Sequence, residues 1–169
     1  RKKIVAIVGG GDTACEEASY LSTLAEKVYL IVRKDYLRAS DIMQKRVLNN
    51  PKIEVLFNHN VEGLFGESKV QGMKLVKNLG KEDESHYEKE IDGFFLAIGH
   101  NPNSELFKEY LETDSIGYIK TIADTPCTAI PGVYAAGDVA DPRYRQAIIA
   151  AARGAKAAME AERYLQELG

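Results

Sequence analysis

The sequence predicts a three-layer α/β fold in which a parallel sheet receives an antiparallel insertion. Short apolar runs rich in β-branched residues at 3–8 and 27–32 indicate buried strands, and a glycine turn followed by a helical pattern connects them. Strand, helix and strand within about 30 residues form one βαβ unit. Such crossovers are nearly always right-handed, so the two strands are expected to be parallel. A further apolar run at 53–57 supplies a third strand.

The predicted helices have recognisable ends. Asp12 or Thr13 is expected to cap the first helix, and Glu16 lies in its first turn. A second helix is expected at 39–48 and ends at the Asn-Asn-Pro run 49–51. Helices that alternate with apolar strands in this way are typical of α/β proteins.

The following segment changes character. Runs at 61–65 and 70–76 have the alternating or mixed polarity of paired strands. The charge run 81–90 is expected to be a solvated hairpin tip rather than an interaction patch. The apolar run 91–98 then predicts a return to a buried strand. The pattern therefore predicts an antiparallel insertion between strands of the buried sheet.

From Gly99 onward the pattern predicts a second unit. A short helix is expected at 104–110, short strands at 118–119 and 133–135, and a long alanine-rich helix at 143–168. So few strands can hardly enclose a core of their own. Together with a first residue that is arginine rather than methionine, this predicts a piece of a longer protein.

Composition and charge exclude several classes of protein. Of 169 residues, 45% are hydrophobic and 28% charged, and 22 basic side chains against 25 acidic ones give a net charge of −3. These proportions exclude collagen-like, mucin-like and wholly disordered chains. The mildly acidic balance offers no general attraction for nucleic acid or anionic membranes. No apolar run approaches the ~20 residues of a membrane span, and the first residues do not resemble a signal peptide.

The cysteines and histidines do not form recognisable sites. Cys15 and Cys127 lie far apart and match neither a CxxC motif nor zinc-ligand spacing. Two reduced thiols are expected, and with them a cytoplasmic protein. His59, His86 and His100 are scattered along the chain, so no metal site is predicted.

The first turn carries the G-x-G-x-x-A variant of the dinucleotide-binding fingerprint, which is typical of Rossmann-like folds. Gly9 permits a tight turn, Gly11 lets the backbone approach a pyrophosphate, and Ala14 lets the helix pack closely on the strand. Free N–H groups at the helix N-terminus would face the phosphates. A glycine turn with a purely structural purpose is the alternative, but the position between a strand and a helix favours dinucleotide binding.

The end of the second strand indicates which dinucleotide is bound. NAD-binding proteins place an acidic residue there for the ribose 2′-hydroxyl. This sequence instead has Arg33, Lys34 and Arg38, three cations within six residues. Arginine meets a phosphate with two parallel hydrogen bonds and lysine adds a point charge, so NADPH is preferred over NADH. A solvated basic turn is the alternative, and Asp35 slightly weakens the preference.

A second glycine cluster lies at 132–139, where a strand runs into Gly-Asp. Asp138 can accept hydrogen bonds from hydroxyl groups. Arg145, Gln146 and Ala147 open the long helix, whose N-terminal amides face an anion favourably. From this chemistry alone, we predict a site for a polyol or a phosphate.

Five motifs, in order, resemble those of the low-molecular-weight thioredoxin reductases, a group of pyridine-nucleotide-disulfide oxidoreductases. They lie at 8–14 (VGGGDTA), 33–39 (RKDYLRA), 97–103 (AIGHNPN), 130–138 (IPGVYAAGD) and 144–147 (YRQA). The resemblance extends over nearly the whole chain. Five ordered motifs form a far more specific signal than one fingerprint.

The resemblance implies a Rossmann-like NADPH-binding domain at 1–97 and a partial FAD-binding domain, its C-terminal segment, at 98–169. The implied contacts of the NADPH pyrophosphate and ribose are Gly9, Gly10, Gly11, Asp12, Thr13 and Glu16, and those of the 2′-phosphate are Arg33, Lys34 and Arg38. Ile98 and Gly99 would lie near the nucleotide at the domain junction. The implied FAD contacts are Asp138 on the ribityl or pyrophosphate part and Arg145, Gln146 and Ala147 at the flavin edge. The family usually has His-Arg-Arg where this chain has Val32, Arg33 and Lys34, so weaker NADPH binding is expected.

The resemblance also implies an activity, namely hydride transfer from NADPH to FAD and onward reduction of a disulfide in thioredoxin or a similar protein, by a homodimer. The family's N-terminal FAD half and its CxxC motif are not among these residues, so no catalytic residue is assigned and this chain alone is expected to be inactive. The alternatives are an NADP-linked flavin or ferredoxin reductase, the flavoprotein of alkyl hydroperoxide reductase, and an NADPH-binding module without catalysis.

Overall fold

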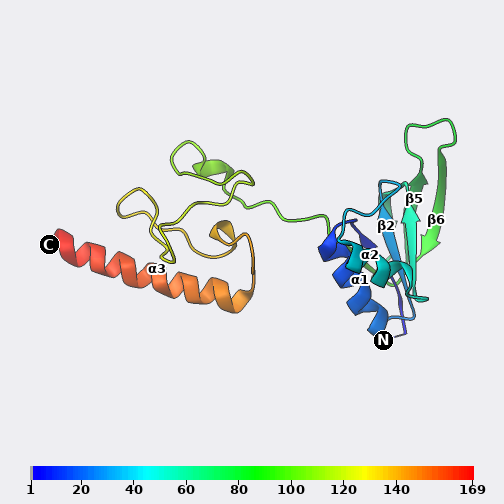
Figure 1. The fold of residues 1–169 in the computed structure, drawn as a ribbon, viewed down its shortest axis with the longest axis horizontal. Coiled ribbons are helices and arrows are strands. Elements are labelled where there is room, and N and C mark those ends of the chain that lie inside the picture. Colours follow the sequence, from blue (N-terminus) through cyan, green and yellow to red (C-terminus); the bar gives the residue numbers. More distant parts are fainter. Residues whose placement is uncertain (1) are drawn as a thin grey trace. The chain divides into compact units, whose positions relative to one another are not determined.

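The computed structural model describes residues 2–169 and divides the chain into two compact units, Arg1–Gly99 and His100–Gly169 (Figure 1). The first unit contains every β-strand of the described residues. The second consists of loops, two short 3₁₀ turns and one long helix. The assignment of 1–97 to NADPH and of 98–169 to FAD stays a prediction.

The centre of the first unit is a four-stranded parallel sheet with the strand order β3-β2-β1-β7. Its strands are β1 (Ile4–Val8), β2 (Lys27–Val32), β3 (Ile53–Phe57) and β7 (Gly93–Leu96). The parallel pairing of β1 and β2 confirms the prediction from the βαβ pattern, and β3 extends the same sheet in parallel.

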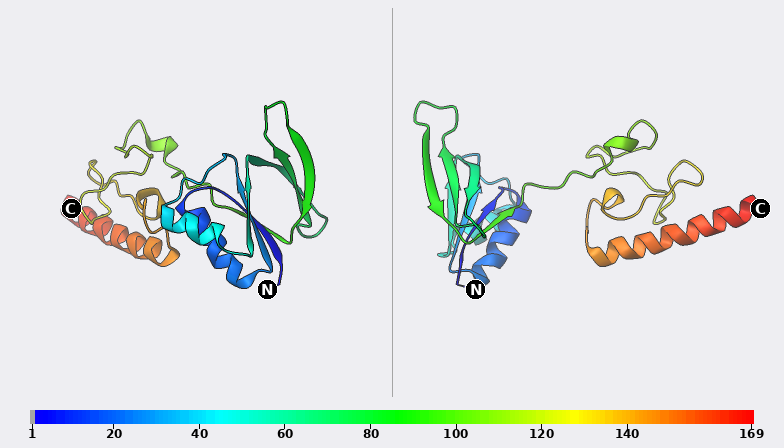
Figure 2. Two further views of the ribbon diagram at one scale, coloured as in Figure 1. Left: turned by 45° about the vertical axis from the view of Figure 1, so that its right-hand side comes forward. Right: turned by 180° about the vertical axis from the view of Figure 1, so that it is seen from behind.

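Two helices, α1 (Asp12–Leu24) and α2 (Asp41–Leu48), pack on one face of this sheet (Figure 2). Ala14 and Ala18 of α1 are fully buried against the strand residues Ile7 and Leu30. Their small side chains let the helix backbone approach the sheet closely, as the fingerprint predicts for Ala14.

An antiparallel sheet covers the other face of the parallel sheet. Its strands, in the order β4-β5-β6, are β4 (His59–Phe65), β5 (Gly72–Lys77) and β6 (Ser85–Glu90). Met73 and Leu75 of β5 pack against Ala6, Tyr29 and Ile31 of the parallel sheet. Helices, parallel sheet and antiparallel sheet thus make the three predicted layers. The charge run 81–90 divides into a turn and the exposed strand β6.

β7 differs from the prediction of a buried strand. Phe95 is 41% exposed, Leu96 64% and Ile98 67%. The cause is position, because β7 is an edge strand with one neighbour, β1, in the sheet. Apolar composition indicates that a segment forms a strand, whereas the number of covering elements decides how much of it is buried.

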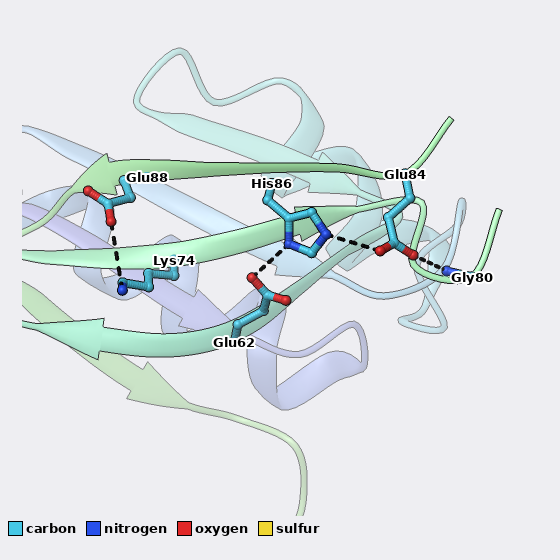
Figure 3. A network of polar contacts seen from close by, with 6 residues as sticks. All are labelled: Glu62, Lys74, Gly80, Glu84, His86 and Glu88. Atoms are coloured by element: carbon cyan, nitrogen blue, oxygen red, sulfur yellow. Dashed lines mark hydrogen bonds and ion pairs between the residues drawn. The ribbon is translucent and has the colours of Figure 1, made fainter. Parts of the chain in front are cut away.

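A histidine between two carboxylates links three parts of the antiparallel layer (Figure 3). In His86, Nδ1 lies 3.0 Å from Glu62 and Nε2 lies 3.0 Å from Glu84. Glu84 also accepts a hydrogen bond from the backbone N–H of Gly80. A carboxylate only accepts, so both contacts require a doubly protonated ring. These hydrogen bonds, that of Glu62 first, raise the pKa of His86 above its usual value.

A Glu62→Gln variant is therefore expected to lower the pKa of His86, because the charged acceptor of one ring nitrogen is lost. An NMR titration of the His86 ring measures this directly. Glu88→Gln is the matched control, since Glu88 pairs with Lys74 in the same sheet (Figure 3). The raised pKa means that the link is intact at low pH and weakens as pH rises through that pKa. An unchanged titration in Glu62→Gln would contradict the assignment.

The second unit has little regular structure apart from α3 (Ala147–Leu168). The short helix predicted at 104–110 is a 3₁₀ turn, Glu105–Phe107. The predicted strands at 118–119 and 133–135 are wrong, because only the isolated bridges Thr113 to Ile119 and Cys127 to Tyr134 form there. One pairing contact is too little to build a strand.

The core of this second unit is small. Ile119, Ala135 and Ala140 form its buried cluster, with Leu111 and Val139 against them. Within the described residues, no side chain of α3 is buried. In the same part of the chain, no helix combines the length and the apolar character needed to cross a membrane.

Candidate functional site

A cavity of about 630 Å³ lies along the carboxyl ends of the parallel strands. Val8, Val32 and Leu96, at the ends of β1, β2 and β7, form part of its lining, and β4 forms the facing wall. Ligands of open α/β sheets bind at this edge. The lining residues are Val8, Gly9, Gly10, Ile31, Val32, Arg33, Lys34, Tyr36, Arg38, His59, Asn60, Val61, Glu62, Gly63, Leu64, Phe94, Leu96 and Ile98.

The three glycines of the turn differ in how much space the structure leaves for a side chain. A Cβ at Gly9 would lie 2.4 Å from the carbonyl oxygen of Ala97 and 2.7 Å from Cβ of Ala14, so the fold itself requires glycine there. A Cβ at Gly10 would lie 3.2 Å from Val32. At Gly11 a Cβ would meet no atom within 4 Å. The open space at Gly11 suits the close approach of a ligand.

A Gly9→Ala variant is expected to lower the free energy of unfolding by about 1–3 kcal/mol, because the new methyl group overlaps a backbone carbonyl. Chemical denaturation of the purified chain measures the loss. Gly63→Ala is the control, since a Cβ at Gly63 has no atom within 4 Å. Equal stability of the two variants would show that Gly9 is not required by packing.

The predicted cap of α1 is wrong. Gly11 is the N-cap, and no side chain caps the helix. The carboxylate of Asp12 instead accepts hydrogen bonds from the backbone N–H of Ser40, at 2.9 Å, and from its hydroxyl, at 2.8 Å. These two donors lower the pKa of Asp12. Asp12 is thus drawn toward the start of α2, a partner 28 residues away that local pattern does not reveal.

Several other residues that were predicted to contact the nucleotide lie outside the cavity lining. Thr13 and Glu16 are exposed on the first turns of α1 and, like Gly11 and Asp12, are not part of the cavity lining. Gly9 and Gly10 do line it. The structure therefore brings only part of the predicted pyrophosphate and ribose set to the cavity wall.

The three predicted cations all line the cavity. Lys34 donates a hydrogen bond to the hydroxyl of Tyr36 at 2.9 Å, and its ammonium lies 5.1 Å from the centre of that ring. Arg38 lies between the buried residues Leu37 and Ala39, and its backbone N–H donates to the carbonyl of Gly10 at 2.6 Å. Asp35 is not part of the lining.

The wall from β4 was not predicted from the sequence. His59 is buried, its Nδ1 donates to the carbonyl of Phe57 at 2.6 Å, and its Nε2 lies 2.8 Å from the hydroxyl of Tyr87. These two partners fix the orientation of the ring. Burial raises the pKa of Tyr87. Only the folding of the insertion back over the sheet brings this wall to the site.

The end of the cavity at β7 is apolar. Phe94 and Leu96 of β7, and Ile98 just beyond the strand, contribute there. Gly99 follows with a φ of +101°, a conformation that glycine adopts without strain. The cavity therefore has a cationic end, at Arg33 to Arg38, and an apolar end.

The predicted FAD residues lie around the start of α3. Asp138 is exposed and follows Gly137, whose φ is +80°. Gln146 is the N-cap of α3 and Ala147 its first residue. The buried carboxylate of Asp141 accepts from the backbone N–H groups of residues 143, 144 and 145 and shapes this loop. An exposed carboxylate and free helix-end amides fit a polyol and phosphate ligand.

The two cysteines are free thiols in different units. Cys15 is fully buried, and burial, with the charges of Asp12 and Glu16, raises its pKa. A thiol with a raised pKa is a poor nucleophile. Neither cysteine has the setting of a redox disulfide. Among the described residues, no cluster of three or more potential metal ligands forms.

Comparison with known proteins shows similarity to thioredoxin reductases along nearly the whole chain. It is 47% identical over 168 residues to the mitochondrial thioredoxin reductase of Kluyveromyces lactis, covering 99% of this chain and 48% of that protein. It is also 49% identical over 168 residues to the thioredoxin reductase of Schizosaccharomyces pombe, a match that covers 99% of this chain and 52% of that protein. The chain thus spans about half the length of the curated relatives it matches.

A solved structure agrees. The thioredoxin reductase of Streptococcus pyogenes matches with a TM-score of 0.86 and 34% identity, over 99% of this chain and 54% of that one. The resemblance stated from the five motifs and the predicted Rossmann-like α/β fold are both confirmed by these matches.

The expectation of a cytoplasmic protein is corrected by the same relatives. Proteins from K. lactis, Saccharomyces cerevisiae and Arabidopsis thaliana that match this chain are named mitochondrial thioredoxin reductases. Two separated thiols indicate only the lack of a disulfide, and they do not distinguish one reducing compartment from another.

A family assignment rests on the extent of the match. The sequence pattern of the family described as pyridine nucleotide-disulphide oxidoreductase matches residues 1–154, most of the chain. That extent, with the cavity at the carboxyl edge of the sheet, identifies the chain as a member of the pyridine nucleotide-disulphide oxidoreductase family.

Proposed function

We propose that this chain is the NADPH-binding domain and the C-terminal FAD-binding segment of an NADPH-dependent thioredoxin reductase. The observation that carries the proposal is the cavity at the strand ends, with three cations at one end and the open glycine turn beside it. The domains would be 1–97 and 98–169, and the relatives named thioredoxin reductase support the activity.

NADPH would lie in this cavity in one direction. Its pyrophosphate would lie at the glycine turn, beside the N-terminal amides of α1 and the open space at Gly11. Its 2′-phosphate would meet Arg33, Lys34 and Arg38. The nicotinamide would then point to the apolar end, toward Ile98. When bound, NADPH supplies a hydride.

The second unit would bind FAD. Asp138 would accept from the ribityl hydroxyls, and Arg145, Gln146 and Ala147 would approach the flavin edge. Thioredoxin or a similar disulfide protein would be the final electron acceptor, and the full-length protein would be a homodimer. Because neither cysteine here has the setting of a redox pair, the reactive disulfide would come from outside these residues.

Thermal unfolding with NADPH and with NADH tests the cofactor assignment. NADPH is expected to raise Tm and NADH to raise it far less, because stabilisation follows ligand affinity. A yellow purified sample would show that FAD is retained. Equal shifts with both nucleotides would contradict the NADPH assignment. The residues encoded ahead of Arg1 test the activity, since a CxxC motif is expected there.

A further inference from the structure

We propose that Asp12 is a positioning residue that holds Arg38 at a set distance from the glycine turn, so that the pyrophosphate and 2′-phosphate of one nucleotide are bound together. This inference deepens the proposed function and rests on it. Asp12 itself would not touch the ligand.

The segment that carries Arg38 is tied to the glycine turn at two points. The backbone N–H of Arg38 donates to the carbonyl of Gly10 at 2.6 Å. Two residues on, Ser40 donates to the carboxylate of Asp12 from its backbone N–H, at 2.9 Å, and from its hydroxyl, at 2.8 Å. Both bonds to Asp12 have a charged acceptor and belong to the stronger class of hydrogen bonds.

Arg38 needs such ties more than the other two cations do. Arg33 and Lys34 directly follow β2, whose position the sheet determines. Arg38 lies further along, in the loop before α2. Its neighbours Leu37 and Ala39 are buried, which anchors the loop in the core, and the contacts with Gly10 and Asp12 set its place relative to the turn.

Ser40 makes its contact with Asp12 from the N-cap position of α2. Its side chain makes no cap hydrogen bond to its own helix, and its hydroxyl proton is donated to the carboxylate of Asp12. The lowered pKa of Asp12 agrees with a carboxylate that stays ionised and accepting at neutral pH.

Because Asp12 is negatively charged, the two explanations predict opposite changes in NADPH affinity when it is replaced. A carboxylate close to a phosphate site repels the ligand, so simple electrostatics predicts that its removal strengthens NADPH binding. A positioning role predicts that removal of the carboxylate weakens NADPH binding. A purely structural role predicts that NADPH and NADH lose affinity equally.

The experiment measures the Kd of NADPH, NADH and ADP by calorimetry for the wild-type chain and for Asp12→Asn, Asp12→Ala, Ser40→Ala and Ser40→Thr. Asp12→Ala is expected to weaken NADPH by about 10-fold, the scale of one charged hydrogen bond. NADH and ADP, which lack the 2′-phosphate, are expected to change by less than about 2-fold. Ser40→Ala removes only one of the two hydrogen bonds to Asp12, so it is expected to weaken NADPH binding less than Asp12→Ala does. Ser40→Thr keeps the hydroxyl and is expected to bind NADPH as the wild type does.

Asp41→Asn is the matched control. It removes one negative charge next to Ser40, in the first turn of α2, and leaves the contact with Asp12 in place. It is expected to bind NADPH at least as well as the wild type. Stronger NADPH binding in Asp12→Asn, or equal losses for all three nucleotides, would overturn the inference. Absence of NADPH binding by the wild type would instead overturn the proposed function, and this inference with it.

Discussion

A Gly11→Val variant is expected to lose NADPH binding while its fold survives. A Cβ at Gly11 meets no protein atom within 4 Å, and its φ of −97° and ψ of −177° are extended values that valine adopts readily. The change of N-cap costs about 1 kcal/mol, too little to unfold a typical domain. The added side chain would occupy the space that the pyrophosphate needs.

Two measurements separate binding from folding in this variant. Calorimetry with NADPH is expected to show no saturable binding, and chemical denaturation to show a cooperative transition close to that of the wild type. Gly154→Val is the control, because Gly154 lies in α3 and a Cβ there also meets open space. NADPH binding that survives in Gly11→Val would remove the glycine turn from the proposed site.

The double variant Arg33→Ala/Arg38→Ala is expected to weaken NADPH binding by about 2–5 kcal/mol, since two charge-assisted contacts to the 2′-phosphate are lost. NADH has no such phosphate and is expected to change little. The ratio of the two dissociation constants, measured by calorimetry at one salt concentration, reports the effect. Salt screens the attraction between the arginines and the phosphate, so a higher salt concentration is expected to reduce the difference in NADPH affinity between variant and wild type.

The control for this pair is Lys45→Ala/Arg46→Ala. It removes the same two positive charges from exposed positions on α2, neither of which lines the cavity. It is expected to bind NADPH nearly as the wild type does. A similar loss of NADPH affinity in both double variants would indicate a general effect of positive charge. An equal loss of NADPH and NADH affinity in Arg33→Ala/Arg38→Ala would reject the cofactor assignment.

Local pattern predicted the βαβ unit closely. The expected strand at 27–32 is observed as Lys27–Val32, and the expected helix at 39–48 as Asp41–Leu48. Apolar runs and turn residues act over a few neighbouring positions, so these elements follow from sequence alone. Arg33 and Lys34 could be placed for the same reason, since both directly follow the end of β2.

Contacts between distant segments were not predictable in this way. Asp12 was expected to cap its own helix, yet it binds Ser40, because two helices that pack side by side bring their starts together. The cavity wall from β4, with His59 and Glu62, likewise depends on how the insertion folds back. Tyr36 was not singled out from the sequence, and its place in the cavity lining beside Lys34 appears only in the folded chain.

The amino-acid sequence by itself determined the layered α/β architecture, the glycine turn and the choice of cationic side chains, because hydrophobic periodicity and turn chemistry are local properties. The tertiary structure alone decided that a side chain at Gly9 would overlap Ala97 and Ala14, and that β7 is an exposed edge. These outcomes depend on which atoms from remote parts of the chain come within contact distance, and burial and steric exclusion arise only when those parts pack together.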